Sequence, residues 1–127
     1  MQVSVDKDGA VNPTHVWCVV DCGITVNPDI VRAQMQSGII FGLSAALYGE
    51  VTIKEGRVEQ TNFGDYRVLR INEAPQIDVQ IVKSSAAPGG IGEPATSCVM
   101  PALTNAIQAA TGKRIRKLPV ADQARVA

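Results

Sequence analysis

Residues 27–47 read NPDIVRAQMQSGIIFGLSAAL, and this stretch decides the fold because it carries the signals of one long helix. Asn27 is a suitable N-cap, since its side chain can accept hydrogen bonds from the first turn, and Pro28 fits the first helical position. Apolar residues then recur every four positions in one stripe, which consists of Val31, Met35, Ile39, Leu43 and Leu47. The stretch therefore predicts an amphipathic helix that ends near Leu47.

A second line of residues runs beside this stripe at the same spacing, and it consists of Gln34, Gly38 and Gly42. The two glycines leave room for a ligand or for another backbone to come close to the helix. Each costs roughly 1 kcal/mol of helix stability relative to alanine, so a break near Gly38 is one outcome. By spacing alone, Gln34 is either an exposed helical glutamine or an amide that hydrogen-bonds a ligand lying over Gly38.

Extended segments surround this helix. Residues 1–9 read as a strand and a turn, and residues 13–23 (PTHVWCVVDCG) predict a strand that ends at Gly23. Because residues 16–20 are apolar at every position, we expect this strand to be buried on both faces. Residues 51–60 predict a hairpin with Glu55 and Gly56 in its turn. Residues 61–75 look irregular, and residues 76–83 alternate like a half-exposed strand.

A glycine-rich loop, SSAAPGGIGEPATS at residues 84–97, leads into a second helix. Pro94 lies near its start, Gly112 is a suitable C-cap, and Pro101 either kinks the helix or marks a second start. Its expected apolar face consists of Val99, Leu103, Ile107 and Ala110. Together the elements predict an α/β fold in the broad sense (α+β). We expect a mixed, largely antiparallel sheet of four or five strands, with the two main helices packed on one face.

Glu93 is the carboxylate that the pattern singles out. Gly89, Gly90 and Gly92 precede it, and glycines allow the backbone to approach a group outside the loop closely. At a helix N-terminus the dipole lowers the pKa of a carboxyl group, whereas burial raises it. A general base needs a pKa between these two extremes. From spacing alone, Glu93 is either such a base or an ordinary first-turn acid.

Composition excludes several functions. The 12 basic and 12 acidic residues cancel and aromatic residues make up 4% of the chain, so neither a nucleic-acid partner nor an anionic membrane is expected. No apolar run reaches eighteen residues, so no membrane span is expected. Three cysteines and a single histidine predict neither a disulfide framework nor a metal site. Sparse cysteine use fits a reducing compartment, so we expect a cytoplasmic rather than an exported protein.

Four stretches together resemble the molybdopterin-binding large (beta) subunit of the xanthine oxidase family, near its C-terminal end. They are VVDCGITVNPD (19–29), AQMQSGIIFGLSAALYGE (33–50), GGIGEP (89–94) and PALTNAIQAATGKRIRKLP (101–119). Within that family the resemblance is strongest to isoquinoline 1-oxidoreductase and to related aldehyde-oxidising enzymes. Residues 1–127 are thus expected to form the C-terminal portion of one molybdenum-cofactor-binding domain.

The resemblance implies an activity and a set of site residues. Such enzymes are molybdenum hydroxylases with a pterin cofactor, and they insert water-derived oxygen into an aromatic N-heterocycle or an aldehyde. The glutamate that matches Glu93 is the catalytic base acting on the metal-bound hydroxyl, and Gly92 belongs to the same contact. The residues that match Gln34 and Gly38 are expected to contact the cofactor. The protein supplies no direct metal ligand in this family.

The resemblance also implies partners. The other pterin contacts belong to the remainder of the large subunit, and electrons pass to an iron–sulfur subunit. We therefore expect the isolated chain to lack the cofactor, and to form a homo-oligomer that covers exposed apolar surface. The alternative reading is a catalytically inactive binding or assembly module that retains the fold. The sequence does not identify the substrate or the electron acceptor. The chain is a natural subunit, the product of a truncated gene or a cloned domain.

Overall fold

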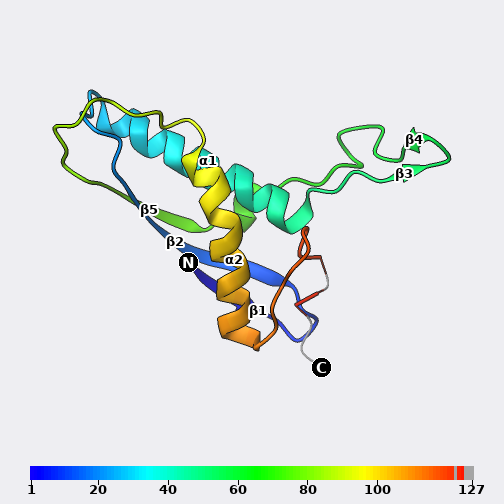
Figure 1. The fold of residues 1–127 in the computed structure, drawn as a ribbon. Coiled ribbons are helices and arrows are strands. Elements are labelled where there is room, and N and C mark those ends of the chain that lie inside the picture. The colour runs from blue at the N-terminus through cyan, green and yellow to red at the C-terminus, as the bar shows by residue number, and fades with distance from the viewer. Residues whose placement is uncertain (122, 125–127) are drawn as a thin grey trace.

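The computed structural model describes residues 1–121 and 123–124. Two long helices dominate it, and five short or medium strands surround them (Figure 1). Along the chain the elements are β1 (Gln2–Val5), β2 (Val11–Val20), α1 (Pro28–Tyr48), β3 (Ile53–Lys54), β4 (Arg57–Val58), a 3-10 turn (Ile71–Glu73), β5 (Gln76–Ile81) and α2 (Pro94–Thr111).

The main sheet has three strands in the order β1-β2-β5. β1 is antiparallel to β2, whereas β5 is parallel to β2, so the sheet is mixed and the α+β fold class is confirmed. The expected four or five strands in one sheet were wrong in number. β3 and β4 pair only with each other, their four residues are exposed, and their hairpin projects away from the helices (Figure 1).

Helix α1 begins as its sequence predicts. The Asn27 side-chain oxygen accepts hydrogen bonds from the backbone N–H groups of Asp29 (3.0 Å) and Ile30 (3.2 Å), and Pro28 is the first helical residue. The helix runs unbroken past Gly38 to Tyr48. All five residues of the apolar stripe, Val31, Met35, Ile39, Leu43 and Leu47, are buried.

Helix α2 is also continuous, so Pro101 neither ends it nor starts a second helix. Gly112 caps its C-terminus in the left-handed conformation (φ 75°) and donates its backbone N–H to the Gln108 carbonyl at 2.8 Å. Val99, Leu103 and Ile107 are buried as expected. Ala110 was wrongly assigned to the buried face, because it lies exposed near the helix end.

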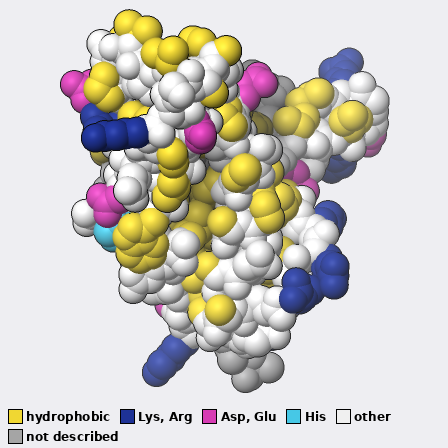
Figure 2. Space-filling view, turned by 60° about the vertical axis from the view of Figure 1, so that its left-hand side comes forward, with side chains coloured by type: hydrophobic (Ala, Val, Ile, Leu, Met, Phe, Trp, Pro, Cys, Tyr) yellow, Lys and Arg dark blue, Asp and Glu magenta, His cyan; other side chains and the backbone are white. Residues whose placement is uncertain are grey.

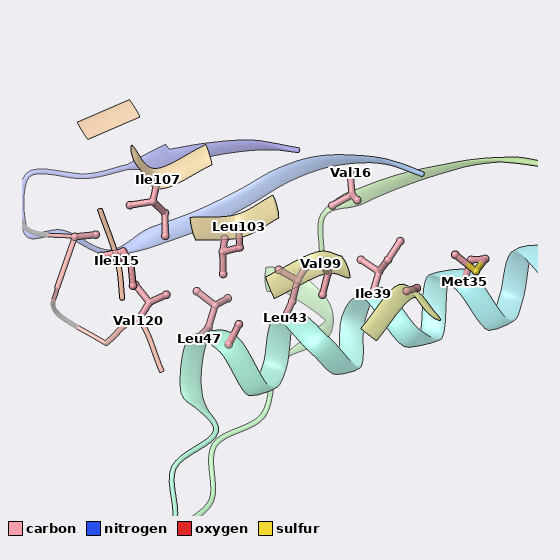
Figure 3. Packing of buried hydrophobic residues seen from close by; sticks show 13 residues of the cluster. Val16, Met35, Ile39, Leu43, Leu47, Val99, Leu103, Ile107, Ile115 and Val120 are labelled. Carbon is pink, nitrogen blue, oxygen red and sulfur yellow. The ribbon is translucent and has the colours of Figure 1, made fainter. Parts of the chain in front are cut away.

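The core lies between the two helices and one face of the sheet. Leu43 of α1 and Leu103 and Ile107 of α2 have no solvent exposure, and their side chains lie in the space between α1 and the sheet (Figure 3). Burying one such side chain stabilises the fold by roughly 1.5–3 kcal/mol. Ile115 and Val120, from the segment after α2, close the same core at its end.

The opposite face of the sheet is open, which corrects the expectation that β2 is buried on both faces. Trp17 is 56% exposed and Val19 is 65% exposed. The His15 ring stacks on Trp17 with centroids 4.1 Å apart, and its Nε2 lies 2.6 Å from an Asp78 carboxylate oxygen on β5. Both helices cover the other face, so the outward side chains of Trp17 and Val19 remain exposed.

Among the described residues, neither helix combines the length and the hydrophobicity that a bilayer crossing requires.

Candidate functional site at the start of helix α2

Glu93 occupies the N-cap position of α2, with Pro94 as the first helical residue. Its side chain makes no capping hydrogen bond and is exposed, although Glu93 could have capped the helix from this position. In the part of the chain that the structure describes, the Glu93 carboxylate has no hydrogen-bond or ion-pair partner. It is therefore available to a group that comes from outside this chain.

A hollow of about 810 Å³ lies in front of this carboxylate, between the first turns of α2 and the middle of α1. Its α1 wall consists of Ser37, Gly38 and Phe41, and its α2 wall of Gly92, Glu93, Pro94, Thr96, Ser97 and Met100. Two of the residues expected from the sequence, Gly38 and Gly92, thus meet Glu93 in one place although the chain separates Gly38 from Glu93 by more than fifty residues.

Thr96 links the two walls. Its backbone N–H donates to the Glu93 carbonyl at 2.9 Å, and its hydroxyl donates to the Gly38 carbonyl on α1 at 3.2 Å. The residue that follows Glu93 by three positions therefore holds the start of α2 against α1, and the position of the Glu93 backbone depends on this contact.

Gly38 and Gly42 allow α1 and α2 to pack closely against each other. A Cβ atom on Gly42 would lie 2.4 Å from Val99 Cγ1 and 2.8 Å from the Thr96 carbonyl oxygen. On Gly38 it would lie 3.1 Å from the Ala95 Cβ. The sequence suggested that this glycine line leaves room either for a ligand or for another backbone. Gly42 leaves room for the backbone of α2, whereas Gly38 both contacts α2 and borders the hollow.

The loop that carries Glu93 is fixed at its far end by the turn after β2. Ile24 donates its N–H to the Ala86 carbonyl (3.0 Å) and Gly89 donates to the Cys22 carbonyl (2.9 Å). Between them, Gly23 has a φ of +71°, and a Cβ atom there would lie 2.2 Å from the Ala87 oxygen. Gly23 was expected only to end a strand, whereas the structure requires a glycine for this crossing.

Gly90 and Gly92 have a different environment. Neither has a positive φ, and a Cβ atom on either would meet nothing within 4 Å. Contacts within this chain therefore do not require glycine at these positions. Their bare backbone leaves the surface beside Glu93 open to a bulky group.

Gln34 is the expected site residue that the structure does not bring into the hollow. It is exposed on α1, one turn before Gly38 and on the same side of the helix. Five residues that line the hollow were not singled out from the sequence: Ser37, Phe41, Thr96, Ser97 and Met100. The only signal for them was spacing, because Ser37 and Phe41 flank Gly38 and Thr96 follows Glu93 by three positions.

A polar cluster lies at the other end of α1. Arg67 donates to the Tyr48 hydroxyl (3.2 Å) and to a Glu73 carboxylate oxygen (2.6 Å), and the Tyr48 hydroxyl donates to the same oxygen at 3.0 Å. The Arg70 backbone N–H, followed by the Arg67 and Tyr48 side chains, lowers the pKa of Glu73. Burial and the hydrogen bond to Glu73 raise the pKa of Tyr48. The cluster ties the irregular segment 61–75 to the helix and lies apart from Glu93.

The cysteines are free thiols, and burial raises the pKa of Cys18. Within residues 1–121 and 123–124, no group of three or more His, Cys, Asp or Glu side chains could hold a metal ion.

Comparison with known proteins assigns the chain to a family. Residues 1–75 match the model of the molybdopterin cofactor-binding domain. The chain belongs to the molybdopterin cofactor-binding domain family. It is 41% identical to the isoquinoline 1-oxidoreductase subunit beta of Brevundimonas diminuta, over 90% of this chain and 15% of that protein. It is 38% identical to a membrane-bound aldehyde dehydrogenase [pyrroloquinoline-quinone] of Gluconacetobacter polyoxogenes, over 94% of this chain and 16% of that protein.

The fold of this molybdopterin cofactor-binding domain also matches a solved structure. Quinoline 2-oxidoreductase from Pseudomonas putida 86 superposes with a TM-score of 0.87 at 25% identity, over 96% of this chain and 17% of that one. The chain thus spans about 15% of the length of the curated relatives that it matches.

The residues around Glu93 fit the group that the family name implies. A molybdenum–pterin cofactor is bulky, and the hollow beside Glu93 is bordered by Gly92, where a Cβ atom would meet nothing within 4 Å, and by Gly38, whose missing side chain faces α2. The carboxylate at its edge has no partner within the described residues, so it can act on a bound group without first losing another contact.

Proposed function

We propose that this domain supplies the catalytic base of a molybdenum hydroxylase and that Glu93 is this base. The observation that carries the proposal is the exposed, unpartnered carboxylate at the edge of the hollow between α1 and α2. A general base must reach the proton that it removes, within about 2.6–3.2 Å. A carboxylate that caps its own helix or pairs with a lysine could do so only after breaking that contact.

When bound, the molybdenum–pterin group supplies the redox chemistry, in which a substrate carbon loses electrons and gains an oxygen that derives from water. Glu93 takes the proton of that water-derived hydroxyl onto one of its carboxylate oxygens. Thr96 holds the Glu93 backbone in place through the bond to its carbonyl.

The remaining site residues contact the cofactor. Gly92 and Gly38 allow it to approach the two walls of the hollow, and the exposed Gln34 amide offers a hydrogen-bond donor and acceptor one turn further along α1. The rest of the large subunit would cover the open side and supply the other cofactor contacts, and an iron–sulfur subunit would accept the electrons.

The substrate class that fits best is an aromatic N-heterocycle or an aldehyde. Two of the relatives are named for isoquinoline and for an aldehyde, and the matched structure is named for quinoline. The hollow is open, so this chain would form only part of a substrate pocket.

A second candidate function is an assembly module without catalytic activity. The exposed Trp17 and Val19 side chains favour it, because apolar residues of this size on a sheet face suit contact with another polypeptide. The two candidates differ in whether the assembled protein holds molybdenum.

The deciding experiment purifies the protein from its own host together with any polypeptide that co-purifies, and measures molybdenum and pterin content. Molybdenum in the purified assembly is the expected result. Glu93→Gln should then retain the metal and lose about 10²- to 10⁴-fold in turnover of quinoline or benzaldehyde, the usual contribution of a general base. Glu50→Gln, an equal charge change at an exposed residue outside the hollow, is the control.

A Glu93→Gln variant that keeps full activity would rule out Glu93 as the base. An assembly that contains no molybdenum would favour the inactive module.

A further inference from the structure

The hairpin β3–β4 forms a sheet of its own that lacks a third strand within the described residues. Its turn residues, Glu55 and Gly56, both have positive φ (51° and 76°), which matches the twist of the two strands and fixes the shape of the hairpin. A two-stranded hairpin by itself is only marginally stable in water, whereas three or more strands with an apolar face are stable. The hairpin therefore has the structure of an incomplete sheet.

The backbone at the outer edge of β4 can pair with another strand. The Glu59 N–H donates to the Thr52 carbonyl at 2.9 Å, so this pair of residues is hydrogen-bonded across the hairpin. Hydrogen-bonded and non-hydrogen-bonded pairs alternate in an antiparallel ladder. The next pair, Ile53 opposite Val58, is therefore not hydrogen-bonded to itself. Val58 directs one N–H donor and one carbonyl acceptor away from β3, and Ile53 does the same at the edge of β3.

The side chains of β4 divide into an apolar and a charged face. Val58 is 47% exposed and lies opposite Ile53, which is 72% exposed. Arg57 and Glu59 point to the other face, because side chains alternate along a strand. Figure 2 shows the hairpin at the upper right, with hydrophobic and charged side chains side by side.

The charges of this hairpin are not balanced within it. Arg57 lies directly opposite Lys54, and like charges at such positions destabilise a hairpin. In the part of the chain that the structure describes, neither Arg57 nor Glu59 belongs to an ion pair. The edge of β4 thus fits a strand that places a carboxylate opposite Arg57 and a cation opposite Glu59.

We propose that this strand is β4 of a second copy of the protein. The two β4 strands pair antiparallel around a two-fold axis that passes between the two Val58 residues, which exchange their N–H and carbonyl groups. Residues equally far from Val58 then lie opposite each other, so Arg57 of each copy faces Glu59 of the other. The result is one four-stranded sheet with two ion pairs on one face, and with Ile53 and Val58 of both copies in an apolar strip on the other.

Charge complementarity favours this pairing over the alternatives. The same two-fold axis placed on β3, at Ile53, would bring Lys54 opposite Thr52 of the second copy, which carries no charge. A parallel pairing in register would bring Arg57 beside Arg57. The antiparallel β4 pairing alone among these three neutralises Arg57, and it is independent of Glu93 and of any cofactor.

Sedimentation equilibrium over a range of protein concentrations tests the proposal, and a reversible monomer–dimer equilibrium is the expected result. Arg57→Glu turns both ion pairs into carboxylate pairs, and Glu59→Arg turns both into pairs of cations. Each variant should weaken dimerisation at least ~10-fold. A mixture of the two variants restores both attractive pairs, so mixed dimers should form at least as readily as dimers of the original chain.

Lys54→Glu is the matched control, because it makes the same charge change on the same hairpin but on the strand that does not face the second copy. It should retain dimerisation. A chain that stays monomeric at every concentration would overturn the proposal. So would a dimer that Arg57→Glu and Lys54→Glu weaken equally, since general repulsion rather than this register would then explain the loss.

Amide hydrogen exchange at Val58, measured by NMR, locates the contact independently of the variants. The Val58 amide should exchange more slowly as the protein concentration rises, while the Ile53 amide at the edge of β3 should not change. The hairpin lies outside the hydrophobic core, and circular dichroism checks that each variant keeps its fold. Exchange at Val58 that does not depend on concentration would show that a second copy does not cover this edge.

Discussion

The Thr96 hydroxyl donates a hydrogen bond to the Gly38 carbonyl at 3.2 Å and joins α2 to α1 beside Glu93. The contact needs two backbones at close range, which Gly38 and Gly42 permit. The position of Glu93 thus depends on how tightly two helices pack, although it lies outside the hydrophobic core.

Thr96→Val should lower the free energy of unfolding by about 1 kcal/mol, because valine has the same shape but cannot donate the partly buried hydrogen bond to Gly38. Urea titration followed by circular dichroism measures this. Thr104→Val is the matched control, since its hydroxyl bonds the Pro101 carbonyl at an exposed site on the same helix, where water can replace the bond. Equal losses in the two variants would show that the link between the helices contributes nothing of its own.

Gly42→Ala should destabilise the protein by about 1–3 kcal/mol, even though alanine favours a helix by up to about 1 kcal/mol over glycine. The added Cβ would lie 2.4 Å from Val99 Cγ1 and 2.8 Å from the Thr96 backbone oxygen, so the helices must separate. The midpoint of thermal unfolding should fall. Gly64→Ala, where a Cβ meets nothing within 4 Å, should leave it unchanged. A Gly42→Ala variant as stable as the original chain would contradict the observed helix packing.

Glu73 should make stability depend on pH in the acid range. Its pKa is lower in the folded state, chiefly through the Arg70 backbone hydrogen bond, so the unfolded state binds more protons. The stabilisation is therefore fully present above the ordinary glutamate pKa of about 4.3 and is lost as the pH falls through the lower folded value. The expected result is that Glu73→Gln is less stable than the original chain at pH 7, and that the difference shrinks toward pH 3.

Urea titrations at several pH values measure this difference, with Glu50→Gln as the control for charge alone. A difference that stayed constant from pH 7 to pH 3 would show that the Glu73 carboxylate is not favoured by folding.

Local signals in the sequence predicted most of the secondary structure. Asn27 and Pro28 mark the start of α1, Gly112 marks the end of α2, and Glu55 and Gly56 form the expected hairpin turn with φ of 51° and 76°. Each signal works because the hydrogen bonds or backbone angles involve residues only a few positions apart. The apolar stripe of α1 succeeded for a related reason, since helix geometry alone places its residues on one side.

The sequence was less informative where two distant segments meet. Val16–Val20 is apolar throughout, yet Trp17 and Val19 are exposed, because composition does not say which face of a strand the helices will cover. Likewise, the sequence suggested that the hairpin β3–β4 belongs to the main sheet, whereas in the structure β3 and β4 pair only with each other. The glycine line of α1 allowed either a ligand or another backbone, and only the fold assigned Gly42 to α2.

By itself, then, the sequence determined the two helices, the glycine-rich loop with Glu93 at its end, and the resemblance that led to the molybdopterin cofactor-binding domain family. Only the tertiary structure decided that Glu93 shares a hollow with Gly38 and Gly92 and that Thr96 links its two walls. The reason is physical. Caps, turns and helix periodicity arise from interactions between near neighbours, whereas a hollow exists only after segments far apart in the chain have packed.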